Sequence, residues 1–282
     1  MIFGAGYVGA EVARQGIARG LRVTALTRNR EKAERLRAQG VATVIADLAE
    51  NTWHSDIPSD AEYVLNSVSS GGGGLEGYEH SYFEGMKSIA SWTRRGVGVG
   101  TLIYTSSTSV YPQGEGSVVD ESATTDGASD RASVLVRTEN VLRTEAMAAR
   151  WFILRLAGIY GPERHHLLEQ VRVGAIAGRG DHRLNLIHRD DICTAIWSAF
   201  GAPPEIKNEI FNVTDDGAAP KAEITAWLAA RLNMPTPQFT GDPAAGRRAI
   251  TPDRVIANAK IKRVLGWQPK YRSYREGYAT MV

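Results

Sequence analysis

The feature that most constrains this chain is a glycine-rich turn near its start, Gly4-Ala5-Gly6-Tyr7-Val8-Gly9, directly after the apolar pair Ile2-Phe3. In such a turn the first glycine permits a tight exit from a strand, the second lets backbone N–H groups approach phosphates, and the third lets a helix pack closely on the strand. The helix that follows presents its free amides to an anion. We therefore predict that Gly4, Gly6, Tyr7, Val8 and Gly9 hold the pyrophosphate of a dinucleotide.

The segment before the turn is short. Only Met1, Ile2 and Phe3 precede Gly4, whereas a strand usually runs about five or six residues. Either the first strand is clipped, or the sequence begins inside the natural strand.

Composition excludes several classes of protein. The 282 residues are 43% hydrophobic and 23% charged, with a net charge of +2, which is ordinary for a globular domain and predicts no nucleic-acid partner. No apolar run approaches the roughly 18 residues of a membrane span, and no signal peptide precedes the turn, so we expect a cytoplasmic protein without a membrane partner. The single cysteine, Cys193, lies in a helical apolar pattern and is interpreted as a core residue.

The cofactor choice is predicted from the end of the second expected strand, residues 21–27. An acidic side chain there would bind the ribose hydroxyls of NAD, but the sequence continues Thr27-Arg28-Asn29-Arg30. Two guanidinium groups suit the 2′-phosphate of NADP. The alternative is that Arg28 and Arg30 belong to a solvated, charged helix start. We favour NADP over NAD.

Two further strand ends supply candidate cofactor contacts. Asp47 and Leu48 follow the third expected strand, residues 41–46, where such folds contact the adenine, although Asp47 is equally suited to a turn. Ser67 and Ser69 lie where the fourth strand, residues 63–68, runs into the glycines at 71–74. That glycine run either lies against the cofactor or forms a flexible loop.

Hydroxyl groups crowd the end of the fifth expected strand, residues 101–105, in the run Thr105-Ser106-Ser107-Thr108-Ser109-Val110-Tyr111. Ligands of open α/β sheets bind outside the carboxyl ends of the strands. Ser107, Thr108 and Tyr111 are therefore candidates for contact with a substrate.

Taken together, the motifs make the chain resemble the extended short-chain dehydrogenase/reductase superfamily, which holds nucleotide-sugar epimerases and dehydratases. Besides the glycine turn and the hydroxyl run, the resemblance rests on Glu121, Leu154-Arg155-Leu156-Ala157-Gly158-Ile159-Tyr160-Gly161-Pro162, Leu186-Ile187-His188-Arg189-Asp190-Asp191, Phe211-Asn212-Val213 and Leu265-Gly266-Trp267-Gln268-Pro269. It implies a Rossmann-type, doubly wound parallel α/β sheet with a smaller C-terminal substrate lobe. We expect residues 1–160 and 188–213 in the dinucleotide domain, and 161–187 and 214–282 in the lobe.

The chain departs from the family's pattern at the reactive pair, a tyrosine and a lysine four residues later. Their expected positions are Arg131 or Ala132 for the tyrosine and Leu135 or Val136 for the lysine. Ser107 matches the family's reactive serine. The chain thus resembles the atypical branch of the superfamily, which keeps the fold and the cofactor turn without the pair.

Other groups are candidates for the missing acid or base. Tyr111, Tyr160 and the pair His165-His166 remain, and imidazole suits proton transfer near neutral pH. Adjacent histidines at the start of a helix are also often solvated, and no third metal ligand accompanies them, so we expect no metal. The residues that we assign to the substrate are Ser107, Thr108, Arg155, Arg164, His166 and Arg247.

Two hypotheses about function follow. The first is an NADP-dependent oxidoreductase or epimerase-like enzyme for a small polar carbonyl or nucleotide-sugar-like substrate, with Ser107, Tyr111 and His165 as candidate catalytic residues. The second is a catalytically silent NADP(H)-binding sensor or regulatory protein. The expected partner is a small molecule, and a homodimer stays open.

Overall fold

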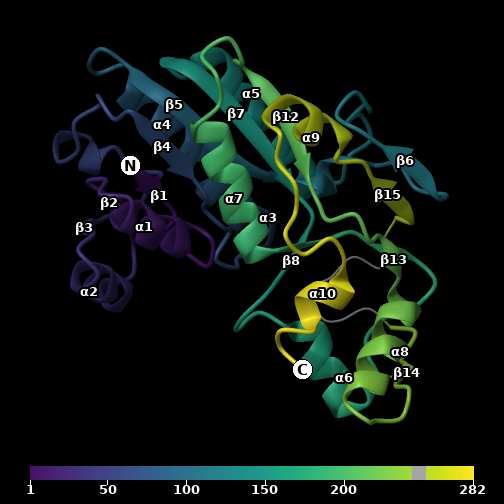
Figure 1. Ribbon diagram of the computed structural model, residues 1–282. Coiled ribbons are helices and arrows are strands. Elements are labelled where there is room, and N and C mark those ends of the chain that lie inside the picture. The colour runs from purple at the N-terminus through teal and green to yellow at the C-terminus, as the bar shows by residue number, and fades with distance from the viewer. Residues whose placement is uncertain (243–251) are drawn as a thin grey trace. The chain divides into compact units, whose positions relative to one another are not determined.

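The computed structural model, which describes residues 1–242 and 252–282, contains a seven-stranded sheet with the order β12-β7-β5-β4-β1-β2-β3 (Figure 1). The pairings of β1 with β2 and β4, of β2 with β3 and of β4 with β5 are parallel. The order runs outward from β1 in both directions, so the predicted doubly wound Rossmann-type sheet is confirmed. Its strands are β1 (Ile2–Phe3), β2 (Thr24–Thr27), β3 (Ala42–Ile45), β4 (Tyr63–Asn66), β5 (Val99–Ser107), β7 (Ala148–Leu156) and β12 (Glu209–Val213).

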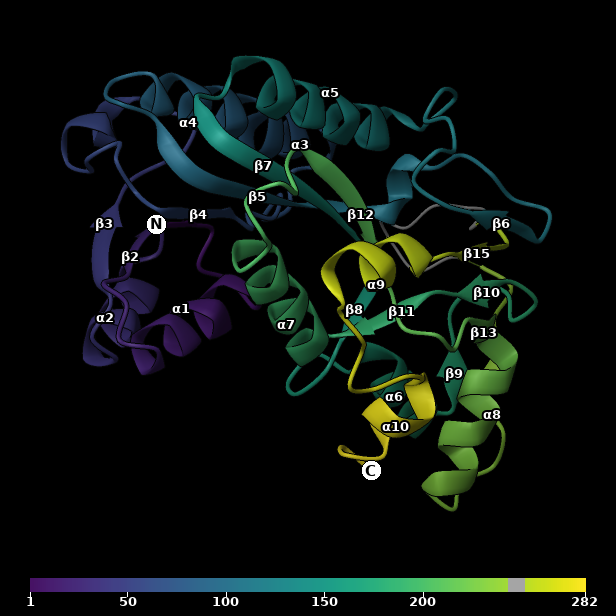
Figure 2. The same ribbon diagram turned by 45° about the horizontal axis from the view of Figure 1, so that its top comes forward.

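Helices cover both faces of this sheet. Figure 2 shows α4 (Gly85–Thr93) and α5 (Asp130–Glu145) along one face, and α1 (Gly9–Ala18) and α2 (Arg30–Ala38) along the other. Burial of apolar side chains between the sheet and α4 and α5 forms a core in which the rings of Phe3, Trp53 and Trp92 contact one another. On the opposite face α1 buries Val12, Ala13 and Gly16 against the sheet.

The helical region expected from Leu75 to Arg95 is present but not uniform. It consists of α3 (Gly74–Tyr78), a π-helical segment (Glu79–Glu84) and α4. A π-helical segment inserts an extra residue into the hydrogen-bond ladder and re-aims the side chains that it carries. The periodicity of the sequence predicted a helix here, but it did not predict this segment.

The strand register aligns the carboxyl ends of the first strands. Phe3 lies opposite Leu26 on β2 and Asn66 on β4, and Thr27 lies opposite Ile45 on β3. The turns after β1, β2, β3 and β4 therefore leave the sheet at one edge. The expected strand over residues 21–27 is shorter than predicted, since β2 begins only at Thr24.

Contacts along the chain define two compact units. The first contains Met1–Val110, Thr125–Arg155 and Ala195–Phe211, and the second contains Tyr111–Thr124, Leu156–Thr194 and Asn212–Val282. The structure thus divides the chain differently from the predicted domains, most clearly by assigning residues 111–124 to the second unit. The physical reason is that β6 (Ser117–Val119) pairs with β15 (Arg254–Ile256) of the C-terminal segment.

The second unit is built from short strands and helices around its own core. That core contains Tyr160, Leu168, Ile224, Leu228 and Tyr278, all buried. Its other elements are β8 (Gly158–Tyr160), α6 (His166–Val173), β9 (Ala175–Ile176), β10 (Arg183–Leu184), β11 (Leu186–His188), β13 (Ala219–Pro220), α8 (Lys221–Arg231), β14 (Gln238–Phe239), α9 (Ala259–Leu265) and α10 (Tyr274–Tyr278); α7 (Arg189–Phe200) begins in it and ends in the first unit.

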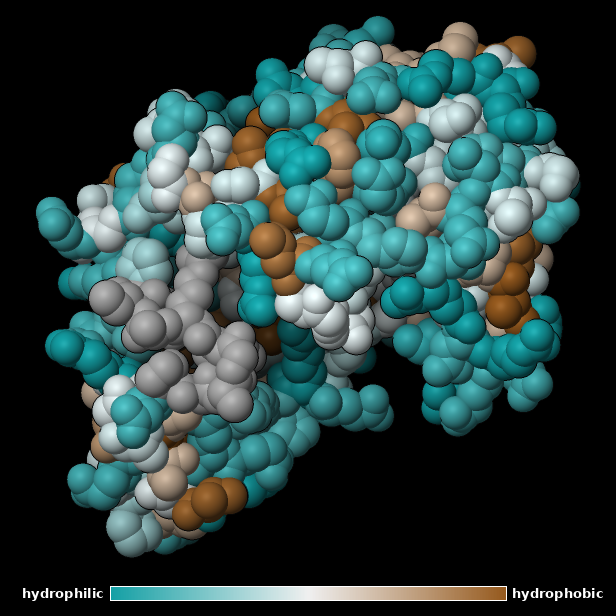
Figure 3. Space-filling model, turned by 180° about the vertical axis from the view of Figure 1, so that it is seen from behind, coloured by the Kyte–Doolittle hydropathy of each residue, from teal (hydrophilic) through white to brown (hydrophobic). Residues whose placement is uncertain are grey.

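On the face shown in Figure 3, hydrophobic residues lie between hydrophilic ones. The large hydrophobic side chains that are exposed in the described ranges are Leu75, Val97, Val118, Met147, Val173 and Val282. Over residues 1–242 and 252–282, none of the helices has both the length and the apolar content that crossing a membrane requires.

Candidate functional site

The glycine turn after β1 is packed on one side and open on the other. Gly4 adopts φ +81° and accepts a hydrogen bond from the Gly6 N–H at 2.7 Å. A Cβ atom on Gly4 would clash with the backbone of Val68, and one on Gly9 would clash with the Gly4 carbonyl. A Cβ atom on Gly6 would meet nothing within 4 Å. Gly4 and Gly9 are thus required by packing, whereas the space beside Gly6 is free for a ligand.

The start of α1 contributes the amides of the turn. Val8 is the N-cap residue, and its side chain makes no capping hydrogen bond. The first-turn N–H groups of a helix have no intrahelical partners and carry a partial positive charge, so they suit an anion. In α1 the Ala10 N–H donates to the Gly6 carbonyl at 3.0 Å. Tyr7 is half-buried and Val8 is buried. Together with the free space at Gly6, this start fits the pyrophosphate of a dinucleotide.

The two serines after β4 have different roles in the structure. The Ser67 hydroxyl donates a hydrogen bond to the Gly4 carbonyl at 2.9 Å, so it stabilises the turn itself. Ser69 is exposed in the loop that leads to the glycine run. Each glycine from 71 to 74 has a positive φ, a backbone conformation that other residues seldom adopt.

A charged cluster lies where β2 and β3 end. Arg28 Nη1 lies 3.4 Å from Asp47 Oδ2, and His80 Nε2 lies 3.0 Å from the same oxygen. Asp47 Oδ1 accepts the Ala49 N–H at 3.0 Å. Burial by itself raises the pKa of Asp47, but the hydrogen bonds from His80 and Ala49 outweigh it and lower that pKa below its ordinary value. Arg30 begins α2 and is exposed.

Leu48 is buried, in contrast to Asp47. Its side chain packs at 3.1 Å from the position of a Cβ atom on Gly85, and its carbonyl accepts the Trp53 indole N–H at 3.2 Å. The structure therefore ties Leu48 to the core beneath the site.

The hydroxyl run ends β5 as predicted. Ser107 is half-buried, and its Oγ accepts the Ser109 N–H at 3.1 Å. Thr108 is buried. The neighbouring Ser106 hydroxyl donates to Glu139 Oε1 at 2.7 Å and so points into the core.

Arg155, expected at the substrate, is buried at the end of β7. Its Nε donates to Glu139 Oε1 at 3.0 Å and its Nη2 to Glu139 Oε2 at 2.6 Å. Arg155 is 5% exposed and Glu139 is 2% exposed. This arrangement favours a structural ion pair between β7 and α5, and the sequence reasoning did not include Glu139 among the functional residues.

The candidate acids and bases lie in the second unit. Tyr111 is fully buried, and its hydroxyl donates to Asn212 Oδ1 at 2.8 Å. His165 Nε2 lies 3.0 Å from Glu169 Oε1. His166 contacts Gln170 one helical turn later, at 2.6 Å between their Nε2 atoms. Arg164 is exposed. Arg247 lies outside the described residues.

The positions that match the family's reactive pair fall on the first turns of α5. The Arg131 guanidinium lies over the Tyr78 ring at 5.6 Å from its centroid. Ala132 and Leu135 are buried. If Arg131 and Leu135 are the matching pair, a cation occupies the tyrosine position and an apolar side chain occupies the lysine position.

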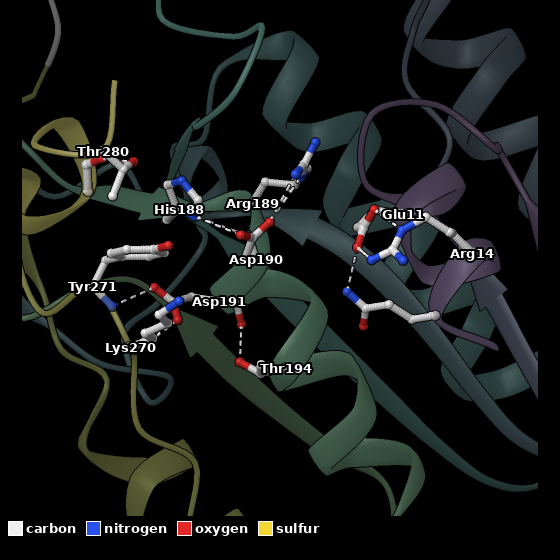
Figure 4. A network of polar contacts seen from close by, with 12 residues as sticks. Glu11, Arg14, His188, Arg189, Asp190, Asp191, Thr194, Lys270, Tyr271 and Thr280 are labelled. Atoms are coloured by element: carbon white, nitrogen blue, oxygen red, sulfur yellow. Dashed lines mark hydrogen bonds and ion pairs between the residues drawn. The ribbon is translucent and has the colours of Figure 1, made fainter. Parts of the chain in front are cut away.

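A further polar network in the second unit was not predicted. Asp191, near the start of α7, points toward the segment containing Lys270 and Tyr271 (Figure 4). Its carboxylate accepts their backbone N–H groups at 2.7 and 3.1 Å. Burial raises the pKa of Asp191 to about 6, against the lowering effect of these bonds. The acidic pair at a helix start was visible in the sequence, but its distant partners were not.

A cavity of about 1060 Å³ lies at the amino ends of the strands, lined by Met1, Thr24, Ala42 and Tyr63 among others. The glycine turn, Arg28 and Ser107 lie instead at carboxyl ends. The cavity is therefore separate from the predicted cofactor site.

Comparison with known proteins decides the family. The model of the NAD-dependent epimerase/dehydratase family matches residues 1–214. The chain belongs to this family. Protein YeeZ of Escherichia coli (strain K12) is similar to it, with 27% identity over 276 residues that cover 96% of this chain and 95% of YeeZ.

Solved structures with the same fold match almost the whole of this chain. A conserved protein of Silicibacter pomeroyi DSS, whose function is unknown, has a TM-score of 0.79 and 24% identity, covering 99% of this chain and 96% of its own. MoeE5 in complex with UDP-glucuronic acid and NAD has a TM-score of 0.81 and 18% identity, with the same two coverages of 99% and 96%. These similarities show the fold.

Proposed function

We propose that this family member is an enzyme that uses a nicotinamide dinucleotide, with NADP preferred, to act on a small polar carbonyl or nucleotide-sugar-like substrate. Membership of the epimerase/dehydratase family supports the class of enzyme. The complex of MoeE5 with NAD and UDP-glucuronic acid supports the type of cofactor and substrate.

One observation carries the cofactor part of the proposal. The turn after β1 is closed by packing at Gly4 and Gly9 but open at Gly6. A side chain at Gly6 would fill the space beside the amides of α1, which is where a pyrophosphate is bound in such folds. The preference for NADP is supported by Arg28 at the end of β2, where an acid would favour NAD.

Other residues of the chain are assigned to substrate binding and proton transfer. A bound nicotinamide supplies hydride exchange with a substrate carbon. Ser107 ends β5 with a half-buried hydroxyl, which suits it to hold a substrate oxygen. His165 and Tyr111 are the candidate acids or bases. His165 Nε2 contacts Glu169 Oε1 at 3.0 Å and the Tyr111 hydroxyl donates to Asn212 Oδ1, so either group would first have to give up this partner to act on a substrate.

Gly6→Ala tests the cofactor site. The variant should fold normally, because its Cβ atom meets nothing within 4 Å, yet it should lose at least about tenfold in affinity for NADP⁺, since the methyl group displaces a phosphate. Isothermal calorimetry measures the affinity and thermal unfolding checks the fold.

Gly114→Ala is the matched control. Its nearest neighbour would be Pro252 at an ordinary 3.7 Å, and its affinity should equal that of the wild type. Unchanged NADP⁺ binding by Gly6→Ala would contradict the proposed site.

A second function is favoured by one specific observation, the absence of tyrosine and lysine from the sequence of α5. A protein that binds NADP(H) without turnover would sense the redox state or regulate a partner. Oxidation of NADPH by the purified protein with any member of a carbonyl panel, abolished in Ser107→Ala or His165→Ala, would exclude this alternative.

A further inference from the structure

One oxygen of the Asp47 carboxylate has two nitrogen neighbours, a guanidinium and an imidazole. Arg28 Nη1 lies 3.4 Å and His80 Nε2 lies 3.0 Å from Oδ2. His80 comes from the π-helical segment after the glycine run, 33 residues along the chain. The shorter of the two contacts is therefore made by His80, which was not among the residues predicted for the site.

In the proposed NADP site, the negative charge of Asp47 lies close to where the 2′-phosphate would bind Arg28. A phosphate monoester carries about −1.5 to −2 charges near pH 7, so a 2′-phosphate at Arg28 is repelled by Asp47. If Arg28 turned to the phosphate alone, Asp47 would lose a cation while an anion approached. His80 leaves Asp47 with a second partner, which removes part of that cost.

The side chains are free enough to rearrange. Arg28 and His80 are 54% and 48% exposed, and Asp47 is 24% exposed. Arg28 Nη2 lies 3.1 Å from the position that a Cβ atom on Gly71 would take. A side chain at Gly71 would crowd the guanidinium, so the glycine leaves it room to swing.

Two cations beside the π-helical segment, Arg137 of α5 and Lys87 of α4, are paired with its glutamates. Arg137 Nη1 lies 2.6 Å from Glu79 Oε1, and Lys87 Nζ lies 3.1 Å from Glu84 Oε2. His80 is the side chain of this segment that contacts the Asp47 carboxylate.

We propose that His80 is a positioning residue for NADP, which holds the Asp47 carboxylate and thereby releases Arg28 to bind the 2′-phosphate. The inference rests on the proposed function. Because NAD lacks the 2′-phosphate, His80 matters for NADP⁺ and not for NAD⁺.

The test measures the dissociation constants of NADP⁺ and NAD⁺ by calorimetry. His80→Ala should weaken NADP⁺ binding by about fivefold to twentyfold and change NAD⁺ binding by less than about twofold. His80→Gln keeps an N–H donor for Asp47 and should recover most of the loss. Lys87→Gln, which removes a paired cation of the neighbouring helix, is the control and should bind both cofactors as the wild type does.

A double variant identifies the path of the effect. In Asp47→Asn the carboxylate charge is gone, so adding His80→Ala should cause no further loss of NADP⁺ affinity. An equal loss for both cofactors, no loss for either, or a full loss that persists in the Asp47→Asn background would overturn the role of His80. Failure of the wild type to bind either cofactor would instead refute the proposed function itself.

Discussion

At the scale of single residues, the site is determined by small contacts at strand ends. A Cβ atom on Gly6 would meet nothing within 4 Å, whereas one on Gly4 or Gly9 would clash with the backbone, and that difference separates a ligand space from a packing contact. Likewise, Ser67 binds the Gly4 carbonyl, whereas Ser107 keeps a half-buried hydroxyl. Both arginines after β2 are exposed, but Arg28 contacts Asp47, whereas Arg30 lies at the first turn of α2.

The preference for NADP therefore depends on Arg28 more than on Arg30. Arg28→Glu should lower affinity for NADP⁺ by about tenfold to a hundredfold, because it removes a charge-assisted hydrogen bond and adds a like charge. Affinity for NAD⁺ should change little. Calorimetric titration with both cofactors measures the ratio, and Arg30→Glu is the matched control with a smaller expected loss. A wild type that prefers NAD⁺ would refute this assignment.

At the scale of elements, the buried pair of Glu139 and Arg155 joins α5 to the end of β7. Ser106 of β5 donates to the same carboxylate, so three neighbouring elements meet at one side chain. A buried ion pair contributes little net stability, but removing one partner leaves an uncompensated charge. The pair therefore matters most for how these elements are aligned beneath the hydroxyl run.

Arg155→Met should lower the free energy of unfolding by about 3 to 5 kcal/mol, since it leaves Glu139 buried with the Ser106 hydroxyl as a partner. Urea unfolding measures this loss. The double variant Arg155→Met with Glu139→Leu should recover much of it, because both charges are then absent. A single variant with wild-type stability that has lost only activity would support a contact between Arg155 and the substrate instead.

At the scale of the whole molecule, stability is coupled to pH through buried carboxyl groups of the second unit. Burial raises the pKa of Asp215 to about 7, against the opposing hydrogen bond from the Gly217 N–H. The unfolded chain releases this proton near its ordinary value of 3.8. Between these values the native state binds more protons than the unfolded state, so stability falls as pH rises.

Loss of the Asp215 proton should therefore lower the free energy of unfolding by about 2 to 3 kcal/mol as the pH rises from about 5 to about 8. Asp215→Asn removes the titration, so the difference in stability between variant and wild type should move in favour of the variant by that amount as pH rises. Chemical unfolding at several pH values measures it. An identical pH dependence in the two proteins would show that Asp215 is not responsible.

The features that were predicted correctly from the sequence depend on local chemistry. The glycine turn, the hydroxyl run and the strand periodicity each depend on residues adjacent in sequence, and the family resemblance that these motifs carry implies the doubly wound sheet. The absence of the tyrosine and lysine pair is likewise a property of the sequence of α5. The π-helical segment was not predictable, because the same apolar spacing suits an α-helix.

The sequence by itself determined the fold class and the place of the glycine turn, and it supplied Arg28 as the candidate phosphate ligand. Only the tertiary structure decided that Arg155 pairs with Glu139, that Tyr111 is bound to Asn212 and that His80 shares Asp47 with Arg28. These contacts join residues that are 16, 101 and 33 positions apart. Such pairings depend on which strand ends and helices the folded chain brings together, and no local spacing encodes that.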